Sequence, residues 1–458
     1  MQKRYWFLLI LIFLLSFSLR LARIDYPDIS GDEAWSWTVA GWSLPEIVGS
    51  DAETNPPLYH ILLFFQRRLA GDSELALRLP SVWLGLLAMA FMGRLGGAVG
   101  KRPLQTITLA MAGIAPFLIY YSQDARMYGA ALAGASGSLM AFVLLWQQEK
   151  RPLSLWVLYG VTSLTAVYSH YYAFAVLLAQ AGFILWTYRR DWLRLRVWVA
   201  TWVAMAALFL PWILIHLSFL GGKASSRFDE WTLDKLGEIV RRTLVAYGAG
   251  VTLSPSESWH GWLMVGLAVV GVIGLWQLGK RRETAVFGSI ILMGLLFAWG
   301  VNPIMPFFWV RYLLVGMPAF VLLSAAGVWW LATLWRPTAV LSLAVVGFVS
   351  VTALQNQFFD VTYFKGGYGR IIADIEQQAQ VGDVILLNNP LQGSLNDYYG
   401  TDSLPTFVVN RGQLFDAEGV DAHLSTLTQD ARRVWVIETG NRAEYDPNQR
   451  VRGWLGER

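Results

Sequence analysis

The chain alternates between long apolar runs and short polar turns, a pattern that predicts a bundle of membrane-spanning helices. A bilayer core of about 30 Å needs about 20 apolar residues in helical form. Eleven crossings are predicted, from residues 6–19, 79–93, 103–123, 127–148, 153–188 (counted twice), 197–220, 261–278, 285–299, 312–335 and 337–351. Residues 153–188 are too long for one crossing, so the chain should fold back near the stretch YSHYY.

The distribution of positive charge supports this number of crossings. Short basic segments (QKR, GRLGGAVGKR, QQEKRP, YRRDWLRLR, GKRRE and LWRP) all fall on one face if eleven helices cross. Short loops rich in Lys and Arg stay in the cytoplasm, which places the N-terminus inside and the C-terminus outside. No small-residue cleavage motif follows the first run, so we interpret it as a retained anchor rather than a signal peptide. The sequence thus predicts a multi-pass protein of the plasma (inner) membrane.

Three longer polar regions are predicted on the outer face. The first is the acidic loop 24–78, and the second is 221–259, where apolar residues recur at helical spacing and favour a helix in the membrane interface. The third is the tail, whose polar stretches read as one helix followed by three strands. We therefore expect two domains: a membrane domain over 1–355, which includes the loop 24–78, and a small extracytoplasmic α/β domain over 356–458.

Composition narrows the function classes. The chain is 55% hydrophobic and only 15% charged, whereas soluble domains carry about 25% charge. It contains no cysteine, which excludes disulfides, thiolate metal sites and a cysteine nucleophile. Five histidines without paired spacing argue against a zinc site. No phosphate-binding loop and no nucleic-acid motif is present.

Carboxylates beside the predicted membrane surface are the first candidates for chemistry. Asp32 and Glu33 lie shortly after the first run, and Asp124 lies at the outer end of another. A carboxylate beside a low-dielectric wall has a raised pKa, which suits a general base. The alternative is that Asp32 and Glu33 simply begin a helix, because acidic residues favour the first turn.

Cationic and aromatic residues at the same depth are candidates for binding. Arg126 and Arg311 end predicted crossings, and a guanidinium fork matches a lipid phosphate, although arginines there more often anchor the helix to headgroups. His170 and Tyr171 in YSHYYAF could bind a sugar or relay a proton, or could belong to an aromatic belt. Tyr59 follows two prolines in NPPLY, where the prolines stiffen the loop and begin a helix.

In order along the chain, these motifs resemble a known superfamily. The stretches GDEAW, PPLY, ELALRLPSVWLGLLA, YYSQDARMYG, YSHYYAF and RYLLVGMPAF resemble those of the GT-C membrane glycosyltransferases. The greatest similarity is to the protein O-mannosyltransferases and the lipid A aminoarabinose transferases, over residues 1–335. The fold implied is a polytopic α-helical GT-C protein of about 11 transmembrane helices with a small C-terminal α/β domain.

The resemblance implies an enzyme that moves a sugar from a polyprenyl-phosphate donor to an acceptor hydroxyl outside the membrane, with inversion. The catalytic Asp of the family's first outer loop matches Asp32, with Glu33 beside it, and the second loop's polar motif matches Asp124, Arg126 and Tyr128. The acceptor implied is a lipid, a glycan or a protein. No cofactor is expected: the mannosyltransferase branch is generally metal-independent, although oligosaccharyltransferases use a divalent metal. Asn55 departs from the family, where Lys or His often precedes the two prolines.

Two other classes compete with this interpretation. A transporter or flippase for lipids or sugars would also have many crossings, but such proteins usually carry charges at mid-membrane and internal symmetry. Here the notable charges lie at helix ends and no half repeats the other. A scaffold that binds partners through the tail would leave the acidic first loop unexplained. A transferase is therefore favoured over a transporter, and a transporter over a scaffold.

Overall fold

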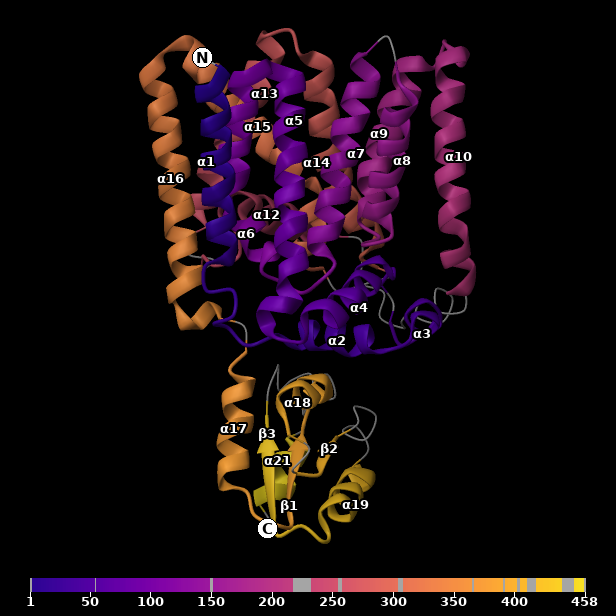
Figure 1. Ribbon diagram of the computed structural model, residues 1–458, viewed down its shortest axis with the longest axis vertical. Helices are drawn as coiled ribbons and strands as arrows, with labels where there is room; N and C mark the ends of the chain where they lie inside the picture. Colours follow the sequence, from indigo (N-terminus) through magenta and orange to yellow (C-terminus); the bar gives the residue numbers. More distant parts are fainter. Residues whose placement is uncertain are drawn as a thin grey trace. The chain divides into compact units, whose positions relative to one another are not determined.

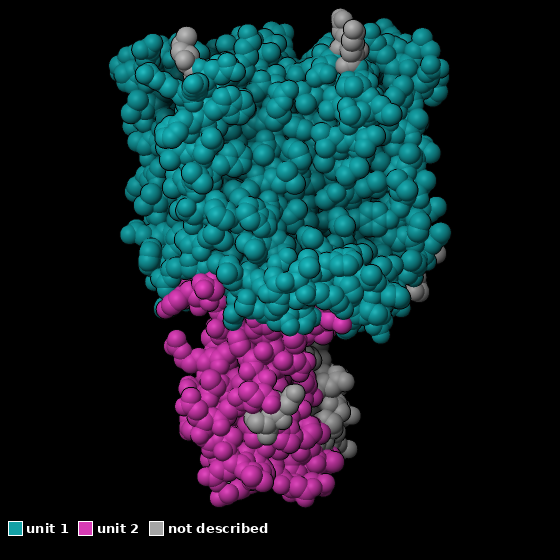
Figure 2. Space-filling view, in the orientation of Figure 1, with its two compact units in different colours: residues 1–24, 42–363 teal, residues 25–41, 364–458 magenta. Residues whose placement is uncertain are grey.

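Two compact units make up the computed structural model. It describes residues 2–53, 55–148, 151–216, 232–253, 258–303, 308–364, 366–389, 392–401, 404–409, 417–438 and 449–456. Residues 1–24 and 42–363 form the first unit, and residues 25–41 and 364–458 form the second (Figure 2). The predicted division assigned the whole loop 24–78 to the membrane domain, whereas residues 25–41 pack with the tail.

Long apolar helices form the first unit (Figure 1). Eight helices in the described residues are long and apolar enough to cross a membrane. They are α1 (Gln2–Leu21), α5 (Glu74–Ile114), α7 (Tyr128–Gln147), α10 (Trp192–Ile215), α13 (Trp259–Gln277), α14 (Arg281–Val301), α16 (Arg336–Phe359), and η2 (Val310–Gly316) with α15 (Met317–Leu334). Two shorter apolar helices, α8 (Leu153–Val167) and α9 (Ala173–Tyr188), separate at the predicted turn. Residues 217–220 of one predicted crossing lie outside the described residues.

The longest of these helices, α5, is a hairpin of two rods. The backbone leaves helical geometry at Gly100 and Lys101, where Lys101 has a φ of 58°. A Cβ atom added at Gly93 or Gly96 would overlap side chains of the returning rod, which shows that the two rods touch through glycine. The second rod then continues through the short helix α6 (Pro116–Ser122). Because α5 supplies two crossings and α8 and α9 one each, the arrangement agrees with the predicted eleven.

The basic turns of the first unit lie together at one end of the bundle. Arg102 lies over the ring of Tyr5 near the start of α1, at 5.0 Å. Arg151, before α8, donates to the hydroxyl of Tyr188 at the end of α9. This grouping matches the predicted common face of the basic loops.

Shorter helices lie at the other end of the first unit. They are α3 (Leu44–Gly49), α4 (Leu58–Ala70) and η3 (Val361–Tyr363), and the predicted interface helix is α12 (Leu233–Ala249). Residues 221–231 of that prediction lie outside the described residues. The buried guanidinium of Arg20, at the end of α1, donates to Ser122 Oγ and to the carbonyls of Ala112 and Gly113. These bonds fix α1 against α5 and α6 at this end of the bundle.

A three-stranded parallel sheet with helices forms the second unit, as the tail pattern predicts. The strands β1 (Asp383–Leu387), β2 (Thr406–Val408) and β3 (Arg433–Ile437) have the order β2-β1-β3. The helices are α2 (Gly31–Gly41), α17 (Tyr368–Gln378), α18 (Gly393–Tyr399), α19 (Ala417–Thr428) and α21 (Arg450–Gly456). Every residue of β1 is buried, as expected for the central strand of a parallel sheet. Ile29 and Ala34, from the N-terminal segment, are buried in the same core as Ile372 and Ile385, which explains why residues 25–41 pack here.

Candidate active site

A buried polar turn joins α6 to α7 in the first unit. It carries Asp124 and Arg126, whose exposed fractions are 4% and 6%. The backbone N–H of Arg126 donates to the carbonyl of Asp124 at 2.7 Å, so both side chains leave one tight turn. Buried charges between apolar helices are unfavourable unless partners stabilise them, and they usually mark a functional site.

Aromatic rings and a second arginine surround this turn. The His170 ring lies 5.1 Å from that of Tyr312 and 5.8 Å from that of Tyr128, measured between centroids. The guanidinium carbon of Arg311 lies 5.6 Å from the centroid of the Tyr128 ring. The structure therefore brings together four of the predicted binding residues, Arg126, Tyr128, His170 and Arg311, from three separate segments of the chain.

The environment of His170 favours binding over proton relay. Its Nδ1 accepts a hydrogen bond from the backbone N–H of Tyr172 at 3.2 Å, which leaves a proton on Nε2 in the neutral ring. Burial, and after it the positive charges of Arg126 and Arg311, lowers the pKa of His170 to about 3. A neutral imidazole can donate one hydrogen bond to a ligand, but it carries no dissociable positive charge near pH 7.

Glu53 and His60 form a buried pair that the sequence reasoning missed. Glu53 is 3% exposed and His60 is fully buried, and Glu53 Oε2 lies 3.6 Å from His60 Nε2. Asn55 holds the other carboxylate oxygen, because its backbone N–H and its side-chain amide both donate to Glu53 Oε1, at 2.7 and 2.8 Å. Asn55 thus fixes the carboxylate of Glu53. In the sequence, the only sign of this pair was a histidine directly after the stretch NPPLY.

Charges couple this pair to the arginine turn. Burial alone would raise the pKa of Glu53, but the charges of His60 and Arg126 and the bonds from Asn55 hold it below its usual value. Burial lowers the pKa of His60 to about 4; the Glu53 carboxylate opposes this shift, and the positive charge of Arg126 adds to it. At neutral pH the pair is therefore a carboxylate beside a neutral imidazole. Neither ring nitrogen of His60 has a hydrogen-bond partner within the part of the chain that the structure describes.

The two remaining predicted tyrosines have different surroundings. The hydroxyl of Tyr171 accepts a hydrogen bond from Trp212 Nε1 at 3.1 Å, and burial, with Glu53 among the smaller causes, raises its pKa. Tyr171 therefore lies near the pair of Glu53 and His60. Tyr59 is fully buried on α4, with its hydroxyl 3.2 Å from Ser81 Oγ of α5. This contact anchors α4 to α5 and favours the structural interpretation of NPPLY.

A cavity of about 480 Å³ lies beside the arginine turn in the first unit. Its lining includes Tyr120, Tyr121, Arg241, Arg242, Trp309 and Arg311. Three guanidinium groups among aromatic rings and small apolar side chains suit a phosphate joined to a hydrocarbon chain. The sequence analysis did not single out Arg241 and Arg242, which lie on the predicted interface helix.

The second unit carries the other predicted carboxylates, at the start of α2. Ser30 Oγ accepts from the backbone N–H of Glu33 at 3.3 Å, and Glu33 Oε2 accepts from the backbone N–H of Ser30 at 2.9 Å. This reciprocal capping box gives the buried Glu33 a structural task, which matches the alternative that the pair begins a helix. Asp32 is partly exposed in the same turn, and the box does not use its carboxylate.

The tail holds the segment before α2 with two sets of hydrogen bonds. Asp28 Oδ2 accepts from the backbone N–H groups of Gly367 and Gly369, at 3.0 and 2.8 Å. The backbone N–H of Ile29 donates to the hydroxyl of Tyr399 at 2.8 Å. These contacts fix the start of the helix that carries Asp32 to residues more than three hundred positions later in the chain.

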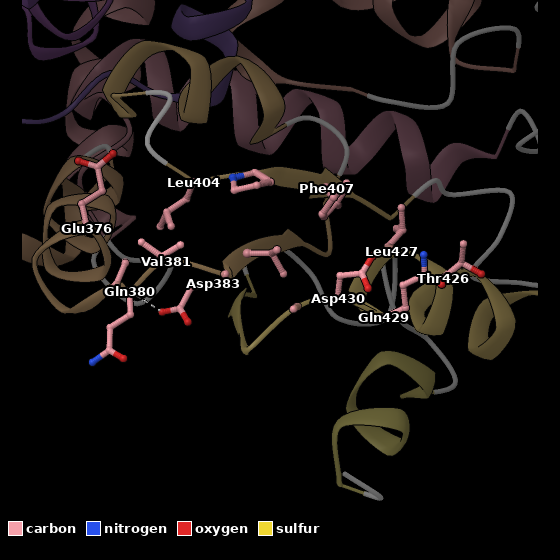
Figure 3. A pocket seen from close by; sticks show the side chains of 15 residues that line it. Glu376, Gln380, Val381, Asp383, Leu404, Phe407, Thr426, Leu427, Gln429 and Asp430 are labelled. Carbon is pink, nitrogen blue, oxygen red and sulfur yellow. Dashed lines mark hydrogen bonds between the residues drawn. The ribbon is translucent and has the colours of Figure 1, made fainter.

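A second cavity, of about 660 Å³, lies within the tail at the amino ends of β1 and β3 (Figure 3). Two of its three carboxylates serve the fold: Glu376 accepts from the hydroxyl of Thr401 at 2.7 Å, and Asp383 accepts from Arg433 Nε at 3.0 Å. Ligands of open parallel sheets bind at the carboxyl ends of the strands, which is the opposite edge. We therefore do not assign this cavity to the active site.

No cluster of three or more His, Asp or Glu side chains suited to a metal ion occurs in the described ranges.

Comparison with known proteins identifies the fold. No protein-family profile matches the chain, and no curated protein is significantly similar in sequence. Among solved structures, ArnT from Cupriavidus metallidurans bound to undecaprenyl phosphate is 15% identical, with a TM-score of 0.59 over 95% of this chain and 90% of that one. The chain has the GT-C fold. The predicted fold class is confirmed, and so is the predicted resemblance in fold to the GT-C proteins.

An oligosaccharyltransferase from Archaeoglobus fulgidus is also similar. The form tethered to an acceptor peptide is 12% identical, with a TM-score of 0.61 over 93% of this chain and 68% of that one. The form in complex with an inhibitory peptide and a dolichol-phosphate is 12% identical, with a TM-score of 0.55 over 87% and 64%. At these identities the likeness concerns the fold alone.

Proposed function

We propose that this chain is an integral-membrane glycosyltransferase that moves a sugar from a polyprenyl-phosphate donor to an acceptor hydroxyl. The observation that carries the proposal is the group formed by the buried Arg126 and His170 with the half-buried Arg311. This group lies beside a cavity with two further arginines, at one end of a bundle of apolar helices. A lipid-linked phosphate is the ligand that unites these features. Its hydrocarbon chain stays in the bilayer, while its phosphate reaches cations at the helix ends.

Asp32 is the proposed base. It removes the proton of the acceptor hydroxyl as the oxygen attacks the anomeric carbon of the donor sugar. The bond from that carbon to the phosphate oxygen breaks, and the phosphate leaves with the electron pair. Arg126 and Arg311 stabilise the negative charge that develops on the leaving phosphate. The sugar–phosphate bond of the donor is already activated, so no nucleotide is needed. A single displacement inverts the anomeric configuration.

The remaining candidates have supporting roles. Tyr128 and His170 offer ring faces and one imidazole N–H to the sugar or the phosphate. Asp124 orients the arginine turn, and it is the alternative base if Asp32 is dispensable. Glu33 shapes the start of α2, while Tyr59 and Tyr171 support the loops around the site. The acceptor is a lipid, glycan or protein hydroxyl.

The proposed reaction takes place on the outer side of the membrane, with the N-terminus in the cytoplasm. The protein has no cysteine, so single cysteines report topology cleanly. Val381, in the tail, is 99% exposed. A cysteine there should react with an impermeant maleimide in intact cells, whereas one at Gln148, between α7 and α8, should not. Equal protection of both positions would contradict this orientation.

Reconstitution tests the activity directly. Protein purified in mild detergent is examined by mass spectrometry for co-purifying polyprenyl phosphates and their sugars, and the species found is supplied in proteoliposomes with candidate acceptors. We expect release of polyprenyl phosphate together with a glycosylated product of inverted configuration. Movement of the lipid-linked sugar between leaflets without any cleavage would instead identify a flippase.

A further inference from the structure

A third cavity, of about 550 Å³, lies at the end of the first unit where the basic turns gather. We call it the arginine–tryptophan pocket. It is lined by the turn after α9 and the turn before α14, with Trp186, Arg189, Arg190, Trp276, Arg281 and Arg282 as its principal side chains. The helix α9 (Ala173–Tyr188) separates it from His170, by about 24 Å at 1.5 Å per residue, so it is distinct from the candidate active site.

No carboxylate in the described part of the chain neutralises the positive charges of this pocket. None of its four arginines forms an ion pair with a carboxylate in the described part of the chain. Its one acidic residue, Asp191, is engaged elsewhere: it accepts from the backbone N–H of Arg194 and pairs with that side chain at 3.2 Å. Glu283, near the start of α14, accepts from Gln147 instead. The pocket therefore concentrates positive charge that an external anion can neutralise.

The tryptophans shape and orient part of this charge. The guanidinium of Arg189 lies 4.3 Å from the ring of Trp186, and that of Arg281 lies 5.1 Å from the ring of Trp276. Stacking on an aromatic face holds a guanidinium in place while its N–H groups remain available. The rings themselves are 73% and 52% exposed, although both are large and apolar. Exposed tryptophans at the ends of apolar helices are typical of the membrane interface.

We propose that the arginine–tryptophan pocket binds the headgroup of an anionic phospholipid from the surrounding bilayer. The phosphate would contact the guanidinium groups of Arg190 and Arg282, and the acyl chains would pass the tryptophans toward exposed apolar side chains of α9 and α13, such as Leu185 and Ile273. A soluble phosphate would use the arginines but gain nothing from this apolar border. Basic pockets between helix ends are established binding places for anionic headgroups.

The test compares lipids retained by the full-length protein in native mass spectrometry. Wild-type protein should retain phosphatidylglycerol in preference to phosphatidylcholine, and inorganic phosphate in millimolar excess should not displace it. The double variant Arg190→Gln, Arg282→Gln should lower retention about tenfold or more. The matched control is Arg94→Gln, Arg102→Gln, which removes the same charge at the same end but outside the pocket, and it should retain the lipid.

Several outcomes would overturn the proposal. Equal loss in the control variant would show that the total charge of this face, rather than the pocket, attracts the lipid. Displacement by inorganic phosphate would identify a soluble-anion site. The double variant Arg190→Lys, Arg282→Lys keeps the charge but loses the planar forks, so we expect intermediate retention. Undiminished retention in the lysine and glutamine variants alike would show that these arginines are not the contact.

Discussion

The two proposed halves of the chemistry belong to different compact units. The proposed base, Asp32, lies on α2, a helix of 11 residues that packs with the α/β tail. The proposed phosphate-binding groups, Arg126 and Arg311, lie between apolar helices of the membrane unit. The first region is held by hydrogen bonds and by a hydrophobic core that it shares with the tail, whereas the second places a buried Arg126 and a half-buried Arg311 at the ends of packed apolar helices.

Because the two regions lie in different units, donor binding and the chemical step should respond separately to mutation. A donor lipid is confined to the bilayer, so its phosphate site gains from rigid, buried cations. The acceptor arrives from outside, so its base is best carried by a domain that faces water. We therefore expect substitutions in the membrane unit to change donor affinity, and substitutions around α2 to change turnover.

The largest effect is expected for Asp32→Asn, which keeps the shape of the side chain and removes the proton acceptor. Turnover should fall about 10²-fold or more, while donor affinity stays within a few-fold of wild type. Both are measured in one detergent, as release of polyprenyl phosphate and as donor binding. Glu33→Gln is the neighbouring control and should lose less turnover. Full activity of Asp32→Asn would make Asp124 the candidate base.

The second-largest effect is expected for the phosphate-binding residues of the membrane unit. Arg126→Ala should weaken donor binding about 10- to 100-fold, because a charge-assisted contact to phosphate is lost from a buried site. Isothermal or fluorescence binding with a polyprenyl phosphate measures it without any turnover. Arg126→Lys should recover part of the affinity, since the charge returns without the fork. Unchanged donor affinity in Arg126→Ala, in a protein that remains monodisperse, would remove Arg126 from the phosphate site.

A smaller effect tests whether the tail positions the base. Asp28→Asn weakens the acceptor of the two glycine amides, and Tyr399→Phe removes the acceptor of the Ile29 amide. Each should lower turnover several-fold with unchanged donor affinity, because α2 loses its fixed start. Asp360→Asn is the matched control: Asp360 also accepts from a backbone amide, that of Thr362, but lies in the first unit. A drop in donor affinity instead would mean that the tail acts on the membrane site.

The sequence was sufficient where local patterning decides the structure. Apolar length and charge placement predicted the helices, and the turn at YSHYY separates α8 from α9 as expected. Asp124, Arg126 and Tyr128 could be proposed as one candidate site because they are close in sequence, and their roles stay predictions. The position of residues 25–41 was not predictable, since it depends on pairing Asp28 with amides 339 and 341 positions away. Likewise, Glu53 and His60 meet only because the loop between them turns back, and no short motif encodes that turn.

The smallest expected effect is the pH dependence contributed by His60. Its pKa is about 4 in the folded protein and near 6.5 in an unfolded chain, so the unfolded chain binds more protons between these values. Stability is thus full above about pH 6.5 and is lost as the pH falls toward 4, by about 2 kcal/mol between pH 7 and pH 5. His60→Gln removes this proton site, so its thermal unfolding temperature in detergent should fall less over that range than that of the wild type.

His216→Gln is the control, because His216 is also buried but bonds to the carbonyl of Val48. If wild type and His60→Gln lose stability equally on acidification, His60 does not titrate as its burial beside Arg126 requires, and the proposed electrostatic coupling of this pair to the arginine turn is wrong.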